Sequence, residues 1–221
     1  MKITISDNIK SLINSRKVVS ALNGNSLTFL RKLEKYLPNY IFWNDGLMGS
    51  FFLYFKNKKN ILRIPGFFLL MKLLQQDCNF VIISSHLNDI HKKKFKNGVR
   101  FISAPLFIES KCYKKFVNSV EIKYNDIIIL GISSPKQEIL ANYIYKKYRV
   151  SIFCLGGALN MFIGYEKRPP IIISKLGFEW IWRLRYDTTR RLIRLIRYLE
   201  IFKFDNMVFL YKLKIKSLIL K

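Results

Sequence analysis

Residues 126–158 read DIIILGISSPKQEILANYIYKKYRVSIFCLGGA, and this stretch decides the fold class. The apolar run Asp126–Leu130 predicts a buried strand, and Pro135–Tyr148 has the length and pattern of a helix. A second apolar run, Val150–Leu155, predicts the next strand. Strand, helix and strand in this order indicate a parallel sheet, because two parallel strands need a crossover between them.

The same alternation of strand and helix continues through most of the chain. Short apolar runs, several rich in Val, Ile or Phe, predict strands, and longer segments between them predict helices. This pattern is typical of a Rossmann-like α/β fold, a mostly parallel sheet with helices on both faces. Further strands are expected over Lys17–Leu22, Tyr40–Trp43, Asn79–Ser84 and Val99–Ser103, and further helices over Ser26–Leu37, Phe67–Gln76, Leu87–Phe95 and Glu109–Val120.

The strand signals stop after about residue 170. Ile172–Arg183, Thr188–Phe204 and Asn206–Lys221 read as consecutive basic, amphipathic helices. We therefore expect two domains, an α/β domain over residues 1–170 and a helical, membrane-associating appendage over residues 171–221. The last helix mixes aromatics, aliphatics and lysines as membrane-surface helices do. The same mixture would also suit a helix that packs on its own core while its lysines face water.

The chain is strongly basic. It has 39 lysines and arginines against 14 aspartates and glutamates, a formal charge of +25, which indicates a polyanionic partner. Nucleic acid, an anionic membrane surface and phosphorylated substrates all qualify. A strongly AT-biased genome would enrich lysine by itself, but it would not cluster arginines. Six arginines fall between Arg183 and Arg197, and because the guanidinium fork fits phosphate, this segment predicts a phosphate contact.

Several classes of protein are disfavoured. No apolar run reaches the about 20 residues needed to span a bilayer, and Met1–Asn14 has no apolar core of a secretory signal. The three cysteines are widely spaced, which suits a reducing cytoplasm. His86 and His91 have no Cys or Glu at ligand spacing, so we expect no metal site and no protein-held cofactor.

Polar residues follow the first two predicted strands, and parallel sheets bind ligands at the carboxyl ends of their strands. Asn44-Asp45-Gly46 is a common turn sequence, yet at this edge Asp45 could act as a general base toward a hydroxyl. Asn23-Gly24-Asn25-Ser26 could bind a sugar or a base through its amides and hydroxyl. Capping of the next helix by Ser26 is the better interpretation from the residues alone.

The loop Gly131–Glu138 leads from a strand into a helix N-terminus, where free amides attract anions. Ser134 and Glu138 stand at the usual N-cap and first-turn positions of that helix. Lys136 and Gln137 could meet phosphate or sugar oxygens. The loop lacks the Walker spacing, so an NTPase is not indicated.

Gly156 and Gly157 follow the Val150–Leu155 strand. Adjacent glycines permit close approach of the backbone to a ligand, although a tight connection from strand to helix explains them equally. The pattern is not G-x-G-x-x-G, so dinucleotide binding gets little support.

Taken in order, these motifs resemble the WecG/TagA/CpsF family of bacterial glycosyltransferases over roughly residues 17–204. No single motif is decisive, but the ordered set is specific. The matching segments are Asn23, Asn44-Asp45-Gly46, Arg63-Ile-Pro-Gly66, Ser134-Pro-Lys-Gln-Glu138, Gly156-Gly157-Ala158 with Gly164, Lys167-Arg168-Pro169-Pro170 and Gly177-Phe-Glu-Trp-Ile-Trp-Arg-Leu184.

The resemblance implies an inverting transferase for surface polysaccharide synthesis on the inner face of the cell membrane. It would move an N-acetylhexosamine-type sugar, often N-acetylmannosamine or its uronic acid, from a UDP donor to a sugar on undecaprenyl diphosphate. The implied partners are therefore the UDP-sugar, the lipid-linked acceptor and an anionic membrane surface, without nucleic acid.

The resemblance also implies Asp45 as the catalytic base, and appendage arginines that complete the active site while the appendage docks on the membrane. Arg183 matches the family's Trp-x-Arg-Leu position. Arg191 and Arg194 are the candidates for later positions, where Arg190 or Arg197 could replace them. The predicted substrate-binding residues are Asn23, Ser26, Arg63, Gly66, Lys136, Gln137, Gly156, Gly157 and Arg168, with no metal ligand.

Four positions depart from the family pattern. Ala21 stands where a threonine is usual, so a polar substrate contact is missing or comes from Ser20. Ser133, Asn160 and Thr188 replace a glycine, an aspartate and a proline. These changes put the identity of the sugar in doubt more than the type of reaction.

Two other functions stay open. The first is a non-enzymatic basic protein that binds membranes or nucleic acid through the arginine helix, although the sequence holds no known nucleic-acid-reading motif. The second is an inactive family member, which the alanine at position 21 suggests.

Overall fold

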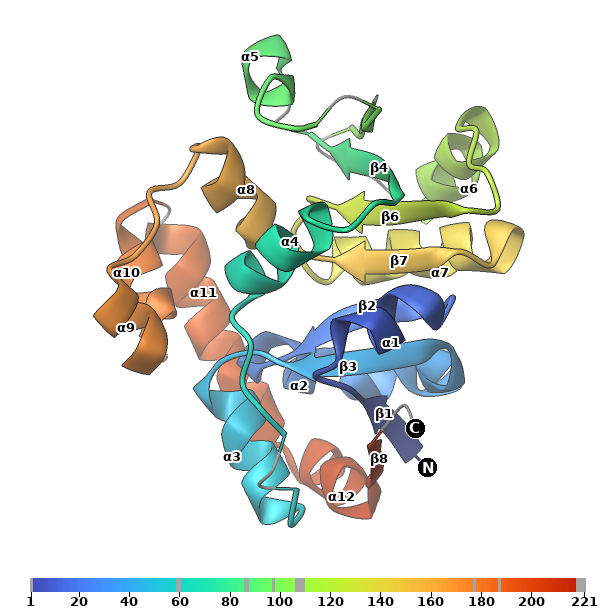
Figure 1. Cartoon of the computed structure of the whole chain (residues 1–221). Coiled ribbons are helices and arrows are strands. Elements are labelled where there is room, and N and C mark those ends of the chain that lie inside the picture. Colours follow the sequence, from blue (N-terminus) through green and yellow to red (C-terminus); the bar gives the residue numbers. More distant parts are fainter. Residues whose placement is uncertain are drawn as a thin grey trace.

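The computed structural model describes residues 2–58, 61–85, 88–96, 98–105, 110–176, 178–186 and 188–217. Within them, one sheet of eight strands has the order β5-β4-β6-β7-β2-β3-β1-β8 (Figure 1). All of its strand pairings are parallel, so the predicted Rossmann-like α/β class is confirmed. The strands are β1 (Lys2–Ile5), β2 (Val18–Leu22), β3 (Tyr40–Asn44), β4 (Asn79–Ser84), β5 (Arg100–Ser103), β6 (Asp126–Leu130), β7 (Ser151–Cys154) and β8 (Lys214–Ser217).

Helices cover both faces of the sheet, and each face has its own apolar cluster. Along β2, Val18 and Leu22 point into the first cluster, whereas Val19 points into the second. This alternation is the reason that the central strands read as continuous apolar runs. Side chains of α2, α3, α6, α7 and α12 line the first cluster, and side chains of α1, α4 and α8 line the second.

The helices differ in length from 4 to 13 residues, and some are extended by 3-10 segments, labelled η. They are α1 (Ile9–Asn14), α2 (Gly24–Phe29), η1 (Leu30–Asn39), α3 (Leu47–Phe55), α4 (Gly66–Leu74), α5 (Asp89–Lys92), α6 (Ser110–Ser119), α7 (Lys136–Tyr148), α8 (Gly157–Ile163), α9 (Ile171–Leu176), α10 (Glu179–Arg183), η2 (Leu184–Tyr186), α11 (Thr188–Tyr198), η3 (Leu199–Phe202) and α12 (Phe204–Lys212).

Three elements of the first 60 residues were not predicted, namely β1, α1 and α3. In β1 the apolar Ile3 and Ile5 alternate with Lys2 and Thr4, and four residues are too few for a reliable local signal. The predicted helix over Ser26–Leu37 is present only in part. Its α-helical portion ends at Phe29 and continues as the 3-10 segment η1.

The predicted N-cap of α7 is wrong. The helix begins at Lys136 after Pro135, and Ser134 instead donates a hydrogen bond to the Glu138 side chain over 2.8 Å. The Ser134–Pro135 peptide bond is cis. At α5, Asn88 caps the helix, and His86 lies outside the described residues.

The end of the chain differs most from the prediction. Asn206–Lys221 is not one helix, because α12 ends at Lys212 and β8 then pairs with β1, aligning Ile215 with Ile3. The two ends of the chain therefore lie side by side at one edge of the sheet (Figure 1). Ile172–Arg183 is two short helices, α9 and α10, and α11 passes into η3 after Tyr198. The division into two domains at residue 170 stays a prediction.

Candidate active site

A topological switch point lies in the middle of the sheet. β2 and β7 are neighbours, and the chain leaves their carboxyl ends toward opposite faces. After β2 it enters α2, where Leu27 packs in the first cluster, and after β7 it enters α8, where Leu159 packs in the second. Such a point opens a crevice between the two loops, which is where open parallel α/β sheets bind ligands. In Figure 1 the helices α9, α10 and α11 lie on this same side of the molecule, beyond the arrowheads of β6 and β7.

Asn23 and Asp45 contact each other at this edge of the sheet. β2 and β3 pair in parallel up to Leu22 and Asn44, so the residues that follow reach the same edge. The Asn23 Nδ2 donates to the Asp45 Oδ2 over 3.2 Å. The Asp45 backbone N–H donates to the Leu22 carbonyl over 3.1 Å, and the residue is partly exposed. The structure thus brings together the predicted base and the predicted first-loop contact.

The Asn23 side chain also begins helix α2. Its Oδ1 accepts from the Ser26 backbone N–H over 3.0 Å, and the Ser26 Oγ accepts from the Asn23 backbone N–H over 2.8 Å. This reciprocal capping box fixes which end of the amide is the acceptor, and so leaves Nδ2 to face Asp45. Ser26 is buried with its hydroxyl engaged in the cap, so the structure gives it a supporting position behind Asn23.

Two glycines set the position of the loop that carries Asp45. Gly46 has φ +83°, which lets the chain turn from β3 into α3. At Gly49 an added Cβ would lie 2.0 Å from the Leu22 carbonyl oxygen, so α3 rests directly on the end of β2. The buried Asn44 amide donates to the Ser50 Oγ over 3.2 Å and ties the strand end to the helix. The loop that carries Asp45 is therefore fixed by the end of β2 and by the start of α3.

The first turn of α7 surrounds a buried carboxyl group, that of Glu138, which was not among the predicted site residues. The Glu138 Oε1 accepts from the Ser20, Ser134 and Gln137 side chains over 3.1, 2.8 and 3.0 Å. Burial raises the pKa of Glu138. Because Ser20 is buried and donates to Glu138, its hydroxyl points into the fold and does not stand in for the hydroxyl that Ala21 lacks. Glu138 follows Lys136 and Gln137 in a polar first turn, so no local signal marked it as buried.

Gln137 lies against Gly156, which links the loops after β6 and β7. A Cβ on Gly156 would be 3.3 Å from the Gln137 Oε1 and 3.0 Å from the Ile132 carbonyl oxygen, and Gly156 has φ +35°. Packing and backbone conformation thus both require glycine here. Among the described residues, the buried Gln137 Oε1 has no hydrogen-bond partner. Lys136 and Gly157 are partly exposed at the starts of α7 and α8.

Arg63 and Arg168 bind other parts of the protein. The Arg63 Nη2 donates to the Ser174 carbonyl over 2.7 Å, which joins the loop before α4 to α9. The exposed Arg168 guanidinium stacks on Phe67 and Phe68, with its Cζ 4.4 and 4.8 Å from the two ring centroids.

Gly66 is the first residue of α4 and lies close to α8. A Cβ at Gly66 would be 3.5 Å from the Ala158 Cβ.

The arginine segment lies next to the Asn23 loop. Arg183 ends α10, and Arg190, Arg191 and Arg194 are in α11, but the side chains of these four arginines lie outside the described part of the structure. Helix α11 packs on α2 through Tyr198, since a Cβ on Gly24 would be 3.0 Å from the Tyr198 ring. The contact between Gly24 and Tyr198 was not predicted, because nothing local marks a contact between residues so far apart.

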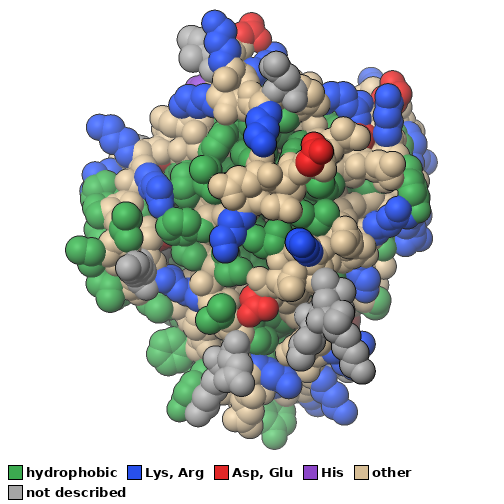
Figure 2. Space-filling view, viewed as in Figure 1, with side chains coloured by type: hydrophobic (Ala, Val, Ile, Leu, Met, Phe, Trp, Pro, Cys, Tyr) green, Lys and Arg blue, Asp and Glu red, His purple; other side chains and the backbone are tan. Residues whose placement is uncertain are grey.

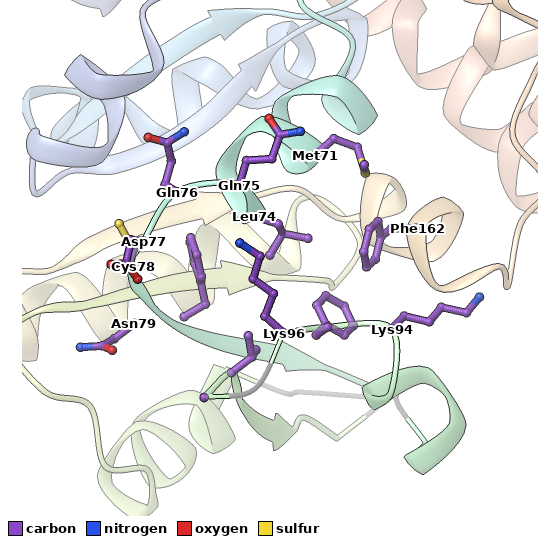
Figure 3. A pocket seen from close by; sticks show the side chains of 14 residues that line it. Met71, Leu74, Gln75, Gln76, Asp77, Cys78, Asn79, Lys94, Lys96 and Phe162 are labelled. Atoms are coloured by element: carbon purple, nitrogen blue, oxygen red, sulfur yellow. The ribbon is translucent and has the colours of Figure 1, made fainter.

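A separate pocket of about 310 Å³ lies toward the opposite end of β4 (Figure 3). Met71 and Leu74 of α4, Phe162 of α8 and Asn79 at the start of β4 line it. Lys96 extends across it in Figure 3, whereas Lys94 points away and donates to the Ile163 carbonyl. None of the predicted site residues with described side chains lines this pocket, so the switch point of the sheet remains the candidate active site.

Two features of the described residues bear on the expected class. No helix among them is long and apolar enough to cross a bilayer. No group of three or more His, Cys, Asp or Glu in this part of the chain lies close enough together to hold a metal ion.

A parallel sheet with an aspartate, an amide and glycine loops at its switch point has the general architecture of an α/β enzyme. Residues 4–218 match the family described as "Glycosyl transferase WecG/TagA/CpsF family", so the chain belongs to this family. The match confirms the resemblance and extends it to nearly the whole chain, including β8 and the second half of β1. The protein is therefore a member of a glycosyltransferase family that acts in surface polysaccharide synthesis.

Proposed function

We propose that this protein is an inverting glycosyltransferase with Asp45 as its general base. It would transfer an N-acetylhexosamine-type sugar, N-acetylmannosamine or its uronic acid, from a UDP donor to a sugar on undecaprenyl diphosphate. The observation that carries the proposal is the Asn23–Asp45 hydrogen bond of 3.2 Å at the switch point of the sheet. There a carboxylate is partly exposed and held in one orientation, as a base in a ligand crevice must be.

The reaction would be a single displacement. The acceptor hydroxyl oxygen attacks the anomeric carbon of the donor sugar, Asp45 takes the hydroxyl proton, and the bond between the anomeric carbon and UDP breaks. General-base help of this kind contributes about 10²- to 10⁴-fold to the rate. The Asn23 amide would keep the Asp45 carboxylate aimed at the acceptor.

The leaving UDP develops negative charge, which cations and backbone amides can stabilise. We assign this task to Arg183, Arg191 and Arg194, because α11 packs against α2 beside the Asn23 loop. Lys136 and Gln137 in the first turn of α7 would contact phosphate or sugar oxygens. Gly156 and Gly157 would let the backbone approach the donor.

Arg63, Gly66 and Arg168 would act at the same edge from the α4 side. Arg168 keeps its guanidinium extended by stacking on Phe67 and Phe68, so its donors stay available to an anionic group. Arg63 already donates to the Ser174 carbonyl, and we propose that it positions α9. We leave Ser26 out of the proposed substrate contacts, since it completes the α2 cap.

The lipid-linked acceptor would bring the protein to the inner face of the cell membrane. Exposed apolar side chains, among them Phe204, Met207 and Tyr211 of α12, support a peripheral attachment. The formal charge of +25 supports a preference for anionic lipids.

The test is incubation with a panel of UDP-sugars and a short-chain polyprenyl-diphosphate sugar, with product mass as the readout. We expect one donor sugar to be added to the acceptor. Asp45→Asn should abolish transfer while the thermal unfolding temperature stays the same. Near-normal turnover by Asp45→Asn would remove the base assignment, and no product with any donor would favour the inactive or non-enzymatic alternatives.

A further inference from the structure

Helix α3 has the composition of a buried helix, but most of its side chains are not buried. Its nine residues, LMGSFFLYF, include no charged side chain and only one serine. A helix that is apolar all round is normally enclosed by protein or lipid. Yet Phe51, Tyr54 and Phe55 are 58, 56 and 76% exposed, and only Gly49 and Leu53 are buried. Helix α3 therefore presents an aromatic surface that the described residues leave largely exposed.

The exposed side of α3 is continuous with that of α12. Lys56 follows α3, and its Nζ donates to the Tyr211 carbonyl over 2.6 Å. The same Nζ lies 5.5 Å from the centroid of the Tyr211 ring and 5.9 Å from that of Phe52. This partial burial between the helices lowers the pKa of Lys56. Lys56 thus bridges two helices that are about 150 residues apart in the chain.

We name this surface the α3–α12 face, and Phe51, Tyr54, Phe55, Phe204, Met207 and Tyr211 define it. Each of these six side chains is more than half exposed. In Figure 1 both helices lie at the lower side of the molecule, and Figure 2 shows hydrophobic side chains along the lower left edge where Figure 1 places α3. Large apolar side chains exposed on neighbouring elements of this kind mark an interaction site.

Charge favours a bilayer over a second copy of this chain as the partner. Lys58 follows α3, Lys203 precedes α12, and Lys212 ends it, while the acidic Asp205 of α12 pairs with Arg31 over 3.0 Å. Two such faces, each on a chain with formal charge +25, would repel each other. An anionic bilayer attracts the lysines, and aromatic side chains beside lysines are the usual composition of interfacial helices.

We propose that α3 inserts its aromatic side chains into the surface of an anionic bilayer. The α/β part of the protein and the C-terminal segment would then both bind the membrane. The proposal rests on the proposed function in one respect, that the acceptor is carried by a membrane lipid.

This arrangement would set the height of the active site above the lipid. Helix α3 begins two residues after Asp45, and Gly49 fixes it against the Leu22 carbonyl. At 1.5 Å per residue, Tyr54 lies about 10 Å along the helix axis from Leu47, the first residue of α3. Aromatics seated in the headgroup region would therefore keep the Asp45 carboxylate within reach of a sugar that is linked by a diphosphate to the same surface.

The first experiment is flotation of the full chain with vesicles of phosphatidylcholine that contain about 30% phosphatidylglycerol. The triple variant Phe51→Ser, Tyr54→Ser, Phe55→Ser should bind these vesicles at least about tenfold more weakly than the wild type. The matched control is Tyr124→Ser, since Tyr124 is 63% exposed at the other end of the sheet, before β6. It should bind like the wild type. Circular dichroism checks that each variant is folded.

The second experiment tests insertion of α3 directly, because it measures contact of a side chain with lipid and not the loss of vesicle binding by a variant. Phe55→Trp should show quenching by brominated lipid above the level that the native tryptophans give in the wild type, whereas Tyr124→Trp should add none. A triple variant that floats like the wild type, or a tryptophan at position 55 that brominated lipid does not quench, overturns the proposal.

Two further outcomes separate the alternatives. A wild type that sediments as a dimer, with a monomeric triple variant, would assign the α3–α12 face to a second copy and overturn the proposal. Flotation does not need sugar transfer. A chain that transfers no sugar but binds vesicles through α3 would therefore overturn the proposed function and support this inference.

Discussion

The Asn23 Nδ2 lies 3.2 Å from the Asp45 Oδ2, and this hydrogen bond joins the carboxyl ends of β2 and β3. The same side chain accepts the Ser26 N–H through its Oδ1. One amide therefore both caps α2 and orients the proposed base. Because the cap decides which amide end faces Asp45, the start of the helix and the geometry of the site are coupled.

Asn23→Ser separates these two tasks. Serine caps helices about as well as asparagine, so the free energy of unfolding should change by less than about 0.5 kcal/mol. The serine hydroxyl is too short to reach Asp45, and kcat should fall by about tenfold or more because the carboxylate no longer has a fixed orientation. Urea unfolding and steady-state kinetics measure the two effects. An unchanged kcat would show that Asn23 only caps the helix.

Asn23→Ala is the control for the cap. It removes both hydrogen bonds, so it should show the same fall in kcat together with about 0.5–2 kcal/mol of destabilisation.

Gly49→Ala should disturb the packing of α3 against the end of β2. The added Cβ would lie 2.0 Å from the Leu22 carbonyl oxygen, and backbone cannot move away as a side chain can. We expect about 3 kcal/mol or more of destabilisation, measured by urea unfolding. Gly66→Ala is the matched control, because its Cβ would lie at an ordinary 3.5 Å from the Ala158 Cβ. Equal stability of the two variants would contradict the close approach of α3.

The central strands and the loops that carry Asn23 and Asp45 could be predicted from local sequence. β2, β3, β6 and β7 are buried on both faces, so they appear as mostly apolar runs, and the parallel order places their ends at one edge. The roles of Asp45 and the arginines came from family resemblance and stay predictions.

The strands β1 and β8, which lie together at one side of the sheet, could not be predicted in this way. In β8 lysines alternate with Ile215, a pattern that also suits an amphipathic surface segment. Only pairing with β1, more than 200 residues away, makes it a strand. The packing of Tyr198 against Gly24 and the Glu138 hydrogen bonds likewise depend on tertiary structure that no local pattern encodes.

The buried Glu138 should make stability depend on pH. Burial raises its pKa in the folded state above the ordinary value of 4.5, so the folded state binds the proton more tightly than the unfolded state. Its contribution to stability is then fully present below pH 4.5 and is lost as the pH rises through the raised pKa.

Glu138→Gln removes this titration and keeps a polar side chain for Ser20 and Ser134. Relative to the variant, the wild type should lose about 1.4 kcal/mol between low and neutral pH for each unit of upward pKa shift. Urea unfolding of both proteins at about pH 4 and pH 7 measures the difference. A stability difference that is the same at both pH values would show that Glu138 does not titrate in this range.

The arginines of α10 and α11 should act through their planar donors as well as their charge. Lysine keeps the charge but cannot bind phosphate through two parallel hydrogen bonds. Arg191→Ala and Arg194→Ala should therefore lower kcat/KM for the UDP-sugar by about 10²-fold, and the lysine variants by less. Arg31→Ala is the control for removal of a positive charge, because Arg31 pairs with Asp205 at the surface. A fall in kcat/KM for Arg31→Ala as large as for the α11 variants would remove the phosphate assignment.

Leu213 should be a core residue although it lies near the end of the chain. It is 1% exposed between α12 and β8 and belongs to the same apolar cluster as Val18 and Phe42. Leu213→Ala should therefore cost about 2–5 kcal/mol of stability. Tyr211→Ala, two residues earlier and 83% exposed, should change stability by less than about 0.5 kcal/mol. If the segment were instead a detached surface helix, both substitutions would be nearly neutral, so urea unfolding of this pair decides whether the end of the chain is part of the folded core.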